Sequence, residues 1–132
     1  MKKSKMFLLA FAAFFLFTTA TSYSQNFFKT EPDMCKMLGD TTFGTAAIVT
    51  FEPGQKTKTH THAAQFVYAM TDGALKVHYA DGRVMDFEMK AGDSFMAPPD
   101  GPHWTENTGK KAMKFILVEF NDNPYKEMKA KK

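Results

Sequence analysis

Residues 43–120 consist of short apolar or alternating runs, and each run is followed by a turn signal. Runs such as "LKVHY" and "VMDFEM" are five or six residues long, and Asp-Gly, Gly-Asp or Pro-Gly pairs follow most of them. Strict alternation of apolar and polar residues is typical of a half-buried strand, and Asp-Gly between two such runs favours a β-hairpin. Short strands at this regular spacing predict an all-β domain, a small antiparallel β-barrel or jelly roll.

Residues 1–24 have the pattern of an export signal. Three lysines precede an unbroken apolar run over residues 6–17, and small and polar residues follow as far as Ser24. About 12 apolar residues are too few to cross a bilayer of roughly 30 Å as a helix. We therefore expect a secretory signal peptide that is cleaved near the bond between Ser24 and Gln25. The expected mature protein is periplasmic or secreted and has no stable membrane anchor; a retained anchor is the alternative.

Cleavage of this signal would leave a balanced charge. The chain has 17 Lys and Arg and 14 Asp and Glu residues, and three of the lysines lie in the signal, so 14 basic residues remain against 14 acidic ones. No basic patch predicts nucleic-acid binding. The rest divides into an N-terminal segment (25–42), the β domain (43–120) and a basic C-terminal tail (121–132). Cys35, the only cysteine, excludes an internal disulfide and is a buried filler, a reactive thiol or an intermolecular bridge.

His60 and His62 stand one residue apart directly before an apolar run. On a strand, residues i and i+2 point to the same side, so the two imidazoles project together and can share one metal ion. Chance alternation of polar residues explains the pair equally well. The pair alone is therefore a weak signal.

A further histidine, His103, follows a turn rich in Pro and Gly in "GDSFMAPPDGPHWTEN". If the barrel closes, the strand that begins there can lie beside the strand that carries His60 and His62. Three imidazoles could then converge on one ion and leave coordination positions open. Such a set suits Fe, Mn, Ni, Cu or Zn.

The two stretches resemble the two sequence motifs of the cupin superfamily, in particular those of small single-domain bacterial type-2 cupins. The residues at the family's motif positions are, in order, Gly54, His60, His62, Gly73, Gly92, Pro98, His103 and Asn107. In the second motif Asp100 holds the place of the usual glycine, and Gly101 follows it. The resemblance covers roughly residues 43–120 and implies a double-stranded β-helix, or jelly roll, with a metal ion at its centre.

The sequence departs from the family pattern at the glutamate of the first motif. That position falls on Phe66, which cannot bind a metal, and Gln65 stands beside it. If the chain turns differently after His62, Gln65 would point inward and offer its amide oxygen as a weak neutral ligand. Otherwise the site consists of His60, His62 and His103 plus water. The lost negative charge should lower the affinity for a divalent cation, and a degenerate site without metal is the alternative.

The resemblance leaves three classes of function open. The first is a non-haem Fe(II) dioxygenase, or another oxidoreductase, that acts on a small enolate, diol or thiol; iron is the preferred metal. The second is a non-catalytic cupin that binds a metal or a small ligand for sequestration or sensing. The third is an assembly role through a homodimer, because barrels of this family commonly pair through edge strands. The sequence identifies no catalytic acid or base.

Strand alternation also predicts where other side chains point. Phe66, Tyr68 and Met70 are expected to line the inner wall around the site. His78 is expected to be an exposed strand residue, and Trp104 to point away from the metal. Glu106 should also face away from the side of His103, and Asn107 should hold its turn by hydrogen bonds. The methionines expected to fill the core include Met85, Met89, Met96 and Met113.

Overall fold

The computed structural model describes residues 25–128 of the chain. The predicted signal peptide and the end of the predicted tail lie outside the described residues. Within the described part, no helix is long and apolar enough to cross a membrane.

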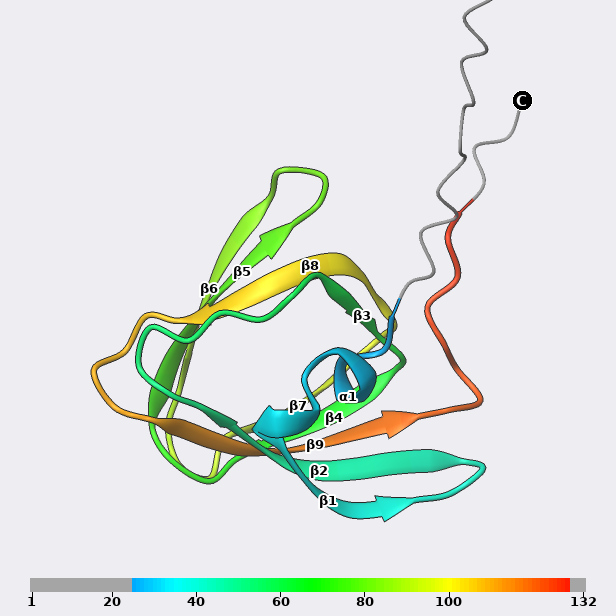
Figure 1. Cartoon of the computed structure of the whole chain (residues 1–132), viewed down its shortest axis with the longest axis horizontal. Helices are drawn as coiled ribbons and strands as arrows, with labels where there is room; N and C mark the ends of the chain where they lie inside the picture. The colour runs from blue at the N-terminus through cyan, green and yellow to red at the C-terminus, as the bar shows by residue number, and fades with distance from the viewer. Residues whose placement is uncertain (1–24, 129–132) are drawn as a thin grey trace, which may run out of the picture.

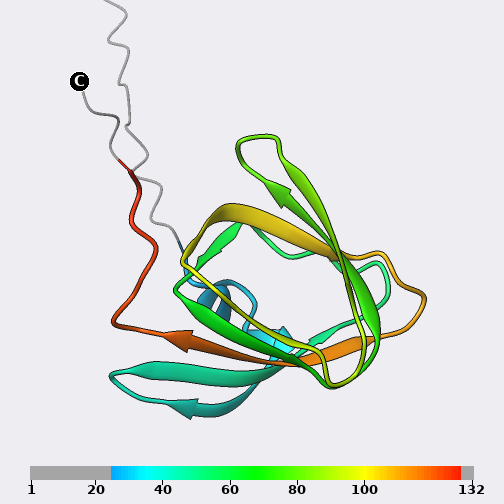
Figure 2. The same cartoon turned by 180° about the vertical axis from the view of Figure 1, so that it is seen from behind.

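In the described part of the chain, nine strands form two antiparallel sheets. The two sheets face each other (Figures 1 and 2). The five-stranded sheet has the order β1 (Cys35–Asp40), β2 (Gly44–Phe51), β9 (Met113–Phe120), β4 (Gln65–Ala69) and β7 (Ser94–Ala97). The four-stranded sheet has the order β3 (His60–His62), β8 (Asp100–Asn107), β5 (Gly73–Tyr79) and β6 (Val84–Met89). The predicted fold class is therefore confirmed: the domain is an all-β jelly roll. Hydrogen bonds join its described strands into two sheets rather than one closed barrel.

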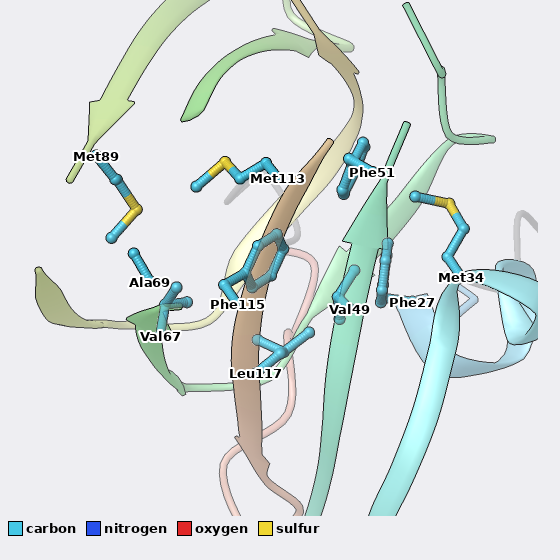
Figure 3. Packing of buried hydrophobic residues seen from close by; sticks show 10 residues of the cluster. All are labelled: Phe27, Met34, Val49, Phe51, Val67, Ala69, Met89, Met113, Phe115 and Leu117. Carbon is cyan, nitrogen blue, oxygen red and sulfur yellow. The ribbon is translucent and has the colours of Figure 1, made fainter. Parts of the chain in front are cut away.

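The hydrophobic core lies between the sheets and follows from strand alternation. In β2 and β9 every second side chain is buried, as expected for a sheet with one face on the core. Figure 3 shows how the buried side chains from the strands and from the N-terminal segment meet. The core cluster consists of Phe27, Met34, Val49, Phe51, Val67, Ala69, Met89, Met113, Phe115 and Leu117.

The N-terminal segment is ordered from residue 25 on and packs against the end of the jelly roll. It forms a one-turn helix, α1 (Phe27–Thr30), a 3-10 turn (Pro32–Met34) and then the edge strand β1. The side chain of Asn26 caps α1 by accepting a hydrogen bond from the backbone N–H of Phe28 at 2.9 Å. In Figure 1, α1 lies in front of the space between the two sheets, and in Figure 2 it lies behind that space.

The chain also stays attached to the domain after β9. The backbone N–H of Ala64 donates to the carbonyl of Asn123 at 2.9 Å. The side chain of Asn121 donates to the carbonyl of Thr41, also at 2.9 Å. The first residues of the predicted tail are therefore hydrogen-bonded both to the loop after β3 and to the β1–β2 turn.

The predicted orientation of the side chains at and after β4 is wrong. Phe66, Tyr68 and Met70 do not line the interior, because Gln65, Val67 and Ala69 are the buried residues of β4. Two residues separate β3 from β4, so the alternation that begins at His60 does not continue in phase into β4.

The methionines divide between core and surface. Met89 and Met113 are buried in the core, as predicted. Met96 is 70% exposed because it lies on the outward face of β7, opposite the cavity-lining Phe95. Met85 shares a face of β6 with Met89, but it is 42% exposed because it lies near the start of the strand, beside the β5–β6 turn. The prediction that these two methionines belong to the core is wrong.

Candidate metal centre

The histidines of the two motifs come together through the pairing of β3 with β8. The two strands are antiparallel, and His60 lies directly opposite His103. The register shifts between His60 and His62, so that His62 pairs with Asp100. The prediction that the strand of His103 lies beside the strand of His60 and His62 is therefore confirmed.

The three imidazoles are buried and form a compact cluster. His60, His62 and His103 are 2%, 9% and 3% exposed. Their ring centroids lie 4.8 Å apart for His60 and His62, 4.5 Å for His60 and His103, and 5.2 Å for His62 and His103. One nitrogen from each ring lies within 4.8 Å of the other two.

Hydrogen bonds at the outer nitrogens set the tautomers of the rings. Nδ1 of His60 lies 2.8 Å from the carbonyl oxygen of Lys58, and Nδ1 of His103 lies 2.7 Å from that of Gly101. A carbonyl oxygen can only accept, so each of these Nδ1 atoms carries the proton. The Nε2 atom of each neutral ring then has a free lone pair that can bind a cation.

His62 is held in the same way by a carboxylate. Its Nδ1 lies 2.5 Å from Oε1 of Glu119, a residue of β9 that is 0% exposed. The second carboxylate oxygen accepts a hydrogen bond from Nδ2 of Asn26, also at 2.5 Å. Asn26, Glu119 and His62 thus form a chain of hydrogen bonds that links the N-terminal segment to the histidine cluster.

Burial keeps the two histidines of the first motif neutral. Burial, together with the neighbouring imidazoles, lowers the pKa of His60 to about 2 and that of His62 to about 3. Burial raises the pKa of Glu119 to about 7, while hydrogen bonds from the backbone of Ala63 and the side chain of Asn26 act in the opposite direction. Neutral imidazoles are the form in which histidine binds a metal.

The donor set fits a transition metal ion. Nε2 of His60 and Nε2 of His62 lie 3.2 Å apart, close to the spacing of roughly 3 to 4 Å that two ligands at about 2.1 Å from one ion require. The ligand atoms of all three histidines lie within 4.8 Å of one another. The lone pairs on the Nε2 atoms of the three histidines repel one another in the absence of a cation. A bound cation would remove this repulsion, because each lone pair would then form a bond to it.

Gln65 lines the same cavity as the three histidines and is buried, whereas Phe66 is on the outer side of β4. The chain therefore makes the different turn after His62 that brings Gln65 inward. Its role as a ligand stays a prediction. Among residues 25–128, the group of possible metal ligands consists of the three histidines alone, and Glu119 contacts the Nδ1 atom of His62.

A cavity of about 350 Å³ extends from the histidines into the core. Most of its wall is apolar and comes from both sheets, with Phe51, Val67, Val77 and Phe115 among the lining residues. Phe27 of α1 closes the wall beside the histidines, with its ring centroid 4.9 Å from that of His60. The Nε2 atoms of the histidines therefore stand at one end of a largely apolar chamber of the size that small-molecule sites have.

The residues expected to face away from the site do so. Trp104 and His78 lie outside the cavity wall and stack on each other, with ring centroids 3.7 Å apart and an interplanar angle of 4°. Nε2 of His78 lies 3.1 Å from Glu106, which also pairs with Lys56. These contacts leave the side chain of His78 half-buried. The prediction of an exposed strand residue is therefore wrong in degree, although His78 does face away from the site.

Asn107 holds its turn as predicted. Its Nδ2 donates to the carbonyl of Phe51 at 3.0 Å and to that of Lys111 at 2.9 Å. Its Oδ1 accepts from the backbone N–H of Gly109 at 2.8 Å. This fully buried amide therefore ties the end of β8 to the end of β2 and to the β8–β9 turn.

Sequence reasoning missed Glu119 and Phe27. A signal for Glu119 exists: in "MKFILVEF" it falls in phase with Met113, Phe115 and Leu117, so alternation places a carboxylate on the buried face. No local pattern points to Phe27, because its contact with the histidines depends on how the N-terminal segment packs on β3.

A jelly roll that gathers His60, His62 and His103 at one end of its interior is the architecture of a cupin, and these histidines could bind a metal ion. The family model described as "Cupin domain" matches residues 47–119. The chain belongs to the cupin family.

Solved structures from three bacteria share this fold. A cupin domain from Bordetella pertussis Tohama I is 23% identical, with a TM-score of 0.60, over 65% of this chain and 90% of that chain. A protein with a double-stranded β-helix domain from Klebsiella pneumoniae is 24% identical, with a TM-score of 0.55, over 69% and 78%. A cupin-like protein from Thermotoga maritima is 24% identical, with a TM-score of 0.51, over 66% and 67%. These similarities concern the fold alone. No curated protein matches the chain.

Proposed function

We propose that this cupin binds one divalent transition metal ion through Nε2 of His60, His62 and His103, with Gln65 as a weak fourth ligand. The observation that supports this most directly is the fixed tautomers: all three outer nitrogens are occupied by acceptors, so all three inner nitrogens offer lone pairs to the same space. Iron is the preferred metal, and Mn, Ni, Cu and Zn suit the same set of donors.

The activity that this site supports best is that of a small oxygenase. Three or four protein ligands leave positions on an Fe(II) ion where O₂ and an enolate, a diol or a thiol could bind side by side. The protein's own part is to hold the three imidazoles, to supply an apolar chamber that excludes water, and to orient the substrate against the metal. Asp100, the one carboxylate that lines the chamber among the described residues, already accepts a hydrogen bond from the hydroxyl of Tyr79 at 3.0 Å.

A non-catalytic role in binding a metal or a small ligand is the second candidate. Phe66 at the family's glutamate position favours it, because the site lacks the negative charge that would help to retain Fe(II).

Oxygen uptake by the Fe(II)-loaded protein distinguishes the two functions. An oxygenase consumes O₂ with one class among small enolates, diols and thiols, and His103→Ala abolishes that uptake. Binding of such a compound without any O₂ consumption supports the second role.

We also propose that the protein is exported, on the basis of the lysines, apolar run and small residues in its first 24 positions. N-terminal sequencing of the mature protein tests this. A mature chain that starts near Gln25 supports export, and a chain that keeps residues 1–24 contradicts it.

A further inference from the structure

The cavity has a polar end and an apolar body. Its polar end carries the three histidines together with Gln65 and Thr105. Away from this end, the wall is made of aliphatic and aromatic side chains, among them Leu75, Met89 and Met113. A ligand that fills this space must therefore place a polar head at the metal and an apolar body in the core.

The wall provides no cationic side chain. Among residues 25–128, no Lys or Arg lines the cavity, and its single carboxylate is Asp100. Oδ2 of Asp100 lies 3.8 Å from Nδ1 of His103, next to the polar end. An anionic group of the ligand that does not bind the metal would be buried without a partner, and such burial is strongly unfavourable. This argues against amino-acid thiols, dicarboxylates and phosphorylated compounds.

Hydrogen-bonding capacity is also scarce. The hydroxyl of Tyr79 is committed to Asp100, and the remaining polar side chains gather at the histidine end. A sugar or another polyhydroxy compound would leave most of its hydroxyl groups unpaired in the apolar part, which costs free energy for each of them.

The seam between the two sheets is apolar as well. β6 is one edge strand of the four-stranded sheet, and β7 is one edge strand of the five-stranded sheet. No hydrogen-bonded pairing joins β6 to β7. Phe87 of β6 and Phe95 of β7 bridge this seam, with their rings stacked at 6.3 Å and an interplanar angle of 23°. Both side chains are half-buried and line the cavity, so a ligand that passes between these strands meets aromatic surface.

We propose that the ligand of this site is an apolar molecule with a single metal-chelating pair of oxygen atoms, at most singly negative and without any further charged group. This inference rests on the proposed metal site and narrows its substrate class. Within the three chemistries considered above, it selects an enolate or a diol with a hydrocarbon body and disfavours charged thiols.

A matched set of probes tests this on the Co(II)-loaded protein, with the visible absorption of cobalt as the readout. Benzoylacetone and acetylpyruvate share a β-diketone head, but the first carries a phenyl ring and the second a carboxylate; cysteine represents the charged thiols. We expect benzoylacetone to bind at least tenfold more tightly than acetylpyruvate, and cysteine not to bind. The affinities of the two compounds for free Co(II) in the same buffer are measured alongside, and the preference that remains after this correction reports the cavity wall.

Adjacent residues of β7 provide the variants. Phe95→Lys places an ammonium group in the cavity wall, whereas Met96→Lys places the same charge on the outer face, where Met96 is 70% exposed. We expect Phe95→Lys to reverse the preference in favour of acetylpyruvate, and Met96→Lys to leave it unchanged. Leu75→Lys, at another half-buried lining position, replaces Phe95→Lys if that variant loses its β-sheet circular dichroism.

The outcomes separate the two proposals. Failure of the wild-type protein to take up cobalt overturns the metal site and this inference together. Normal cobalt uptake with equal or stronger binding of acetylpyruvate or cysteine overturns the inference alone. An unchanged preference in a folded variant with a lysine in the wall also overturns it.

Discussion

At the scale of single residues, Glu119 is the most constrained group of the domain. It is fully buried, yet both carboxylate oxygens are used: Oε1 by Nδ1 of His62 and Oε2 by Nδ2 of Asn26. A buried carboxylate without partners would be very unfavourable, so these hydrogen bonds make its position possible. In return the carboxylate fixes the tautomer of His62 and increases the basicity of Nε2, the nitrogen that would bind the proposed metal ion.

The change Glu119→Gln should therefore weaken metal binding by about 10–100-fold, the usual cost of losing an outer partner of a ligand histidine. An amide of the same shape can place its oxygen toward either His62 or Asn26, and its NH2 group then faces the other donor without a hydrogen bond. Isothermal titration of the apoprotein with Zn²⁺ measures the loss. Glu106→Gln is the matched control, because Glu106 contacts a histidine, His78, on the outer face and its loss should leave the affinity unchanged. Equal affinity in Glu119→Gln would refute the role of this carboxylate.

The structure also distinguishes between Cys35 as a buried filler and Cys35 as a reactive thiol. The side chain is half-buried and packs against the core cluster. Burial, helped by the charges of Glu31 and Glu119, raises the pKa of the thiol from 9.0 to about 11. Cys35 therefore resembles a filler more than a reactive thiol.

A raised thiol pKa means that the neutral form dominates below pH 11, so alkylation should be slow. Two pH units correspond to about a hundredfold less thiolate than an ordinary cysteine has at the same pH. We expect the rate of iodoacetamide labelling at pH 8 to be lower than that of the urea-unfolded chain by at least this order, and to rise with pH up to about 11. Fast labelling of the folded protein at pH 7 would contradict this.

At the scale of elements, the comparison of sequence with structure shows where alternation works as a guide and where it fails. Within a strand it assigns the face correctly: it places His60 with His62 and turns Trp104 and Glu106 away from them. It does not assign burial, since Met85 shares a face of β6 with the buried Met89 and is itself exposed. Across a break alternation fails, since the two residues between β3 and β4 move Gln65 inward and Phe66 outward. No local pattern records the packing of α1 on β3, because that contact joins segments that are some thirty residues apart.

Close packing between β5 and β9 gives a prediction at this scale. A Cβ atom at Gly73 would lie 2.4 Å from Cγ and Sδ of Met113, a residue with no exposed surface. Gly73→Ala should therefore overpack the core and lower the free energy of unfolding by about 1–3 kcal/mol. Urea denaturation followed by circular dichroism measures this. Gly39→Ala, where no atom lies within 4 Å of the new Cβ, is the control, and equal stability of the two variants would show that the core accommodates the methyl group.

At the scale of the whole molecule, the candidate centre joins parts that are distant in sequence. His60 and His62 come from β3, His103 from β8, and the supporting groups from β9 and from the segment before α1. A metal ion bound here would connect them all, and the unfolded chain offers no comparable site. Binding of the ion should therefore raise the free energy of unfolding of the whole domain. The predicted homodimer stays a prediction, although β1 leaves Met37 and Leu38 exposed at one edge of the five-stranded sheet.

Metal binding should raise the thermal stability of the domain. At a free metal concentration a thousandfold above Kd, the added stability is about 4 kcal/mol, which corresponds to a Tm increase of about 15–30 °C for a domain of this size. Differential scanning calorimetry with and without Zn²⁺ measures the shift, and EDTA should reverse it. A variant with His60→Ala and His62→Ala should show no shift; a shift as large as that of the wild type would place the ion elsewhere.

Elemental analysis of the protein purified from its native compartment is the decisive test of the proposed metal centre. We expect about one transition metal ion per chain in the wild type, and none in the double variant His60→Ala and His62→Ala, whose β-sheet circular dichroism stays intact. The same metal content in the wild type and in the folded double variant would contradict it.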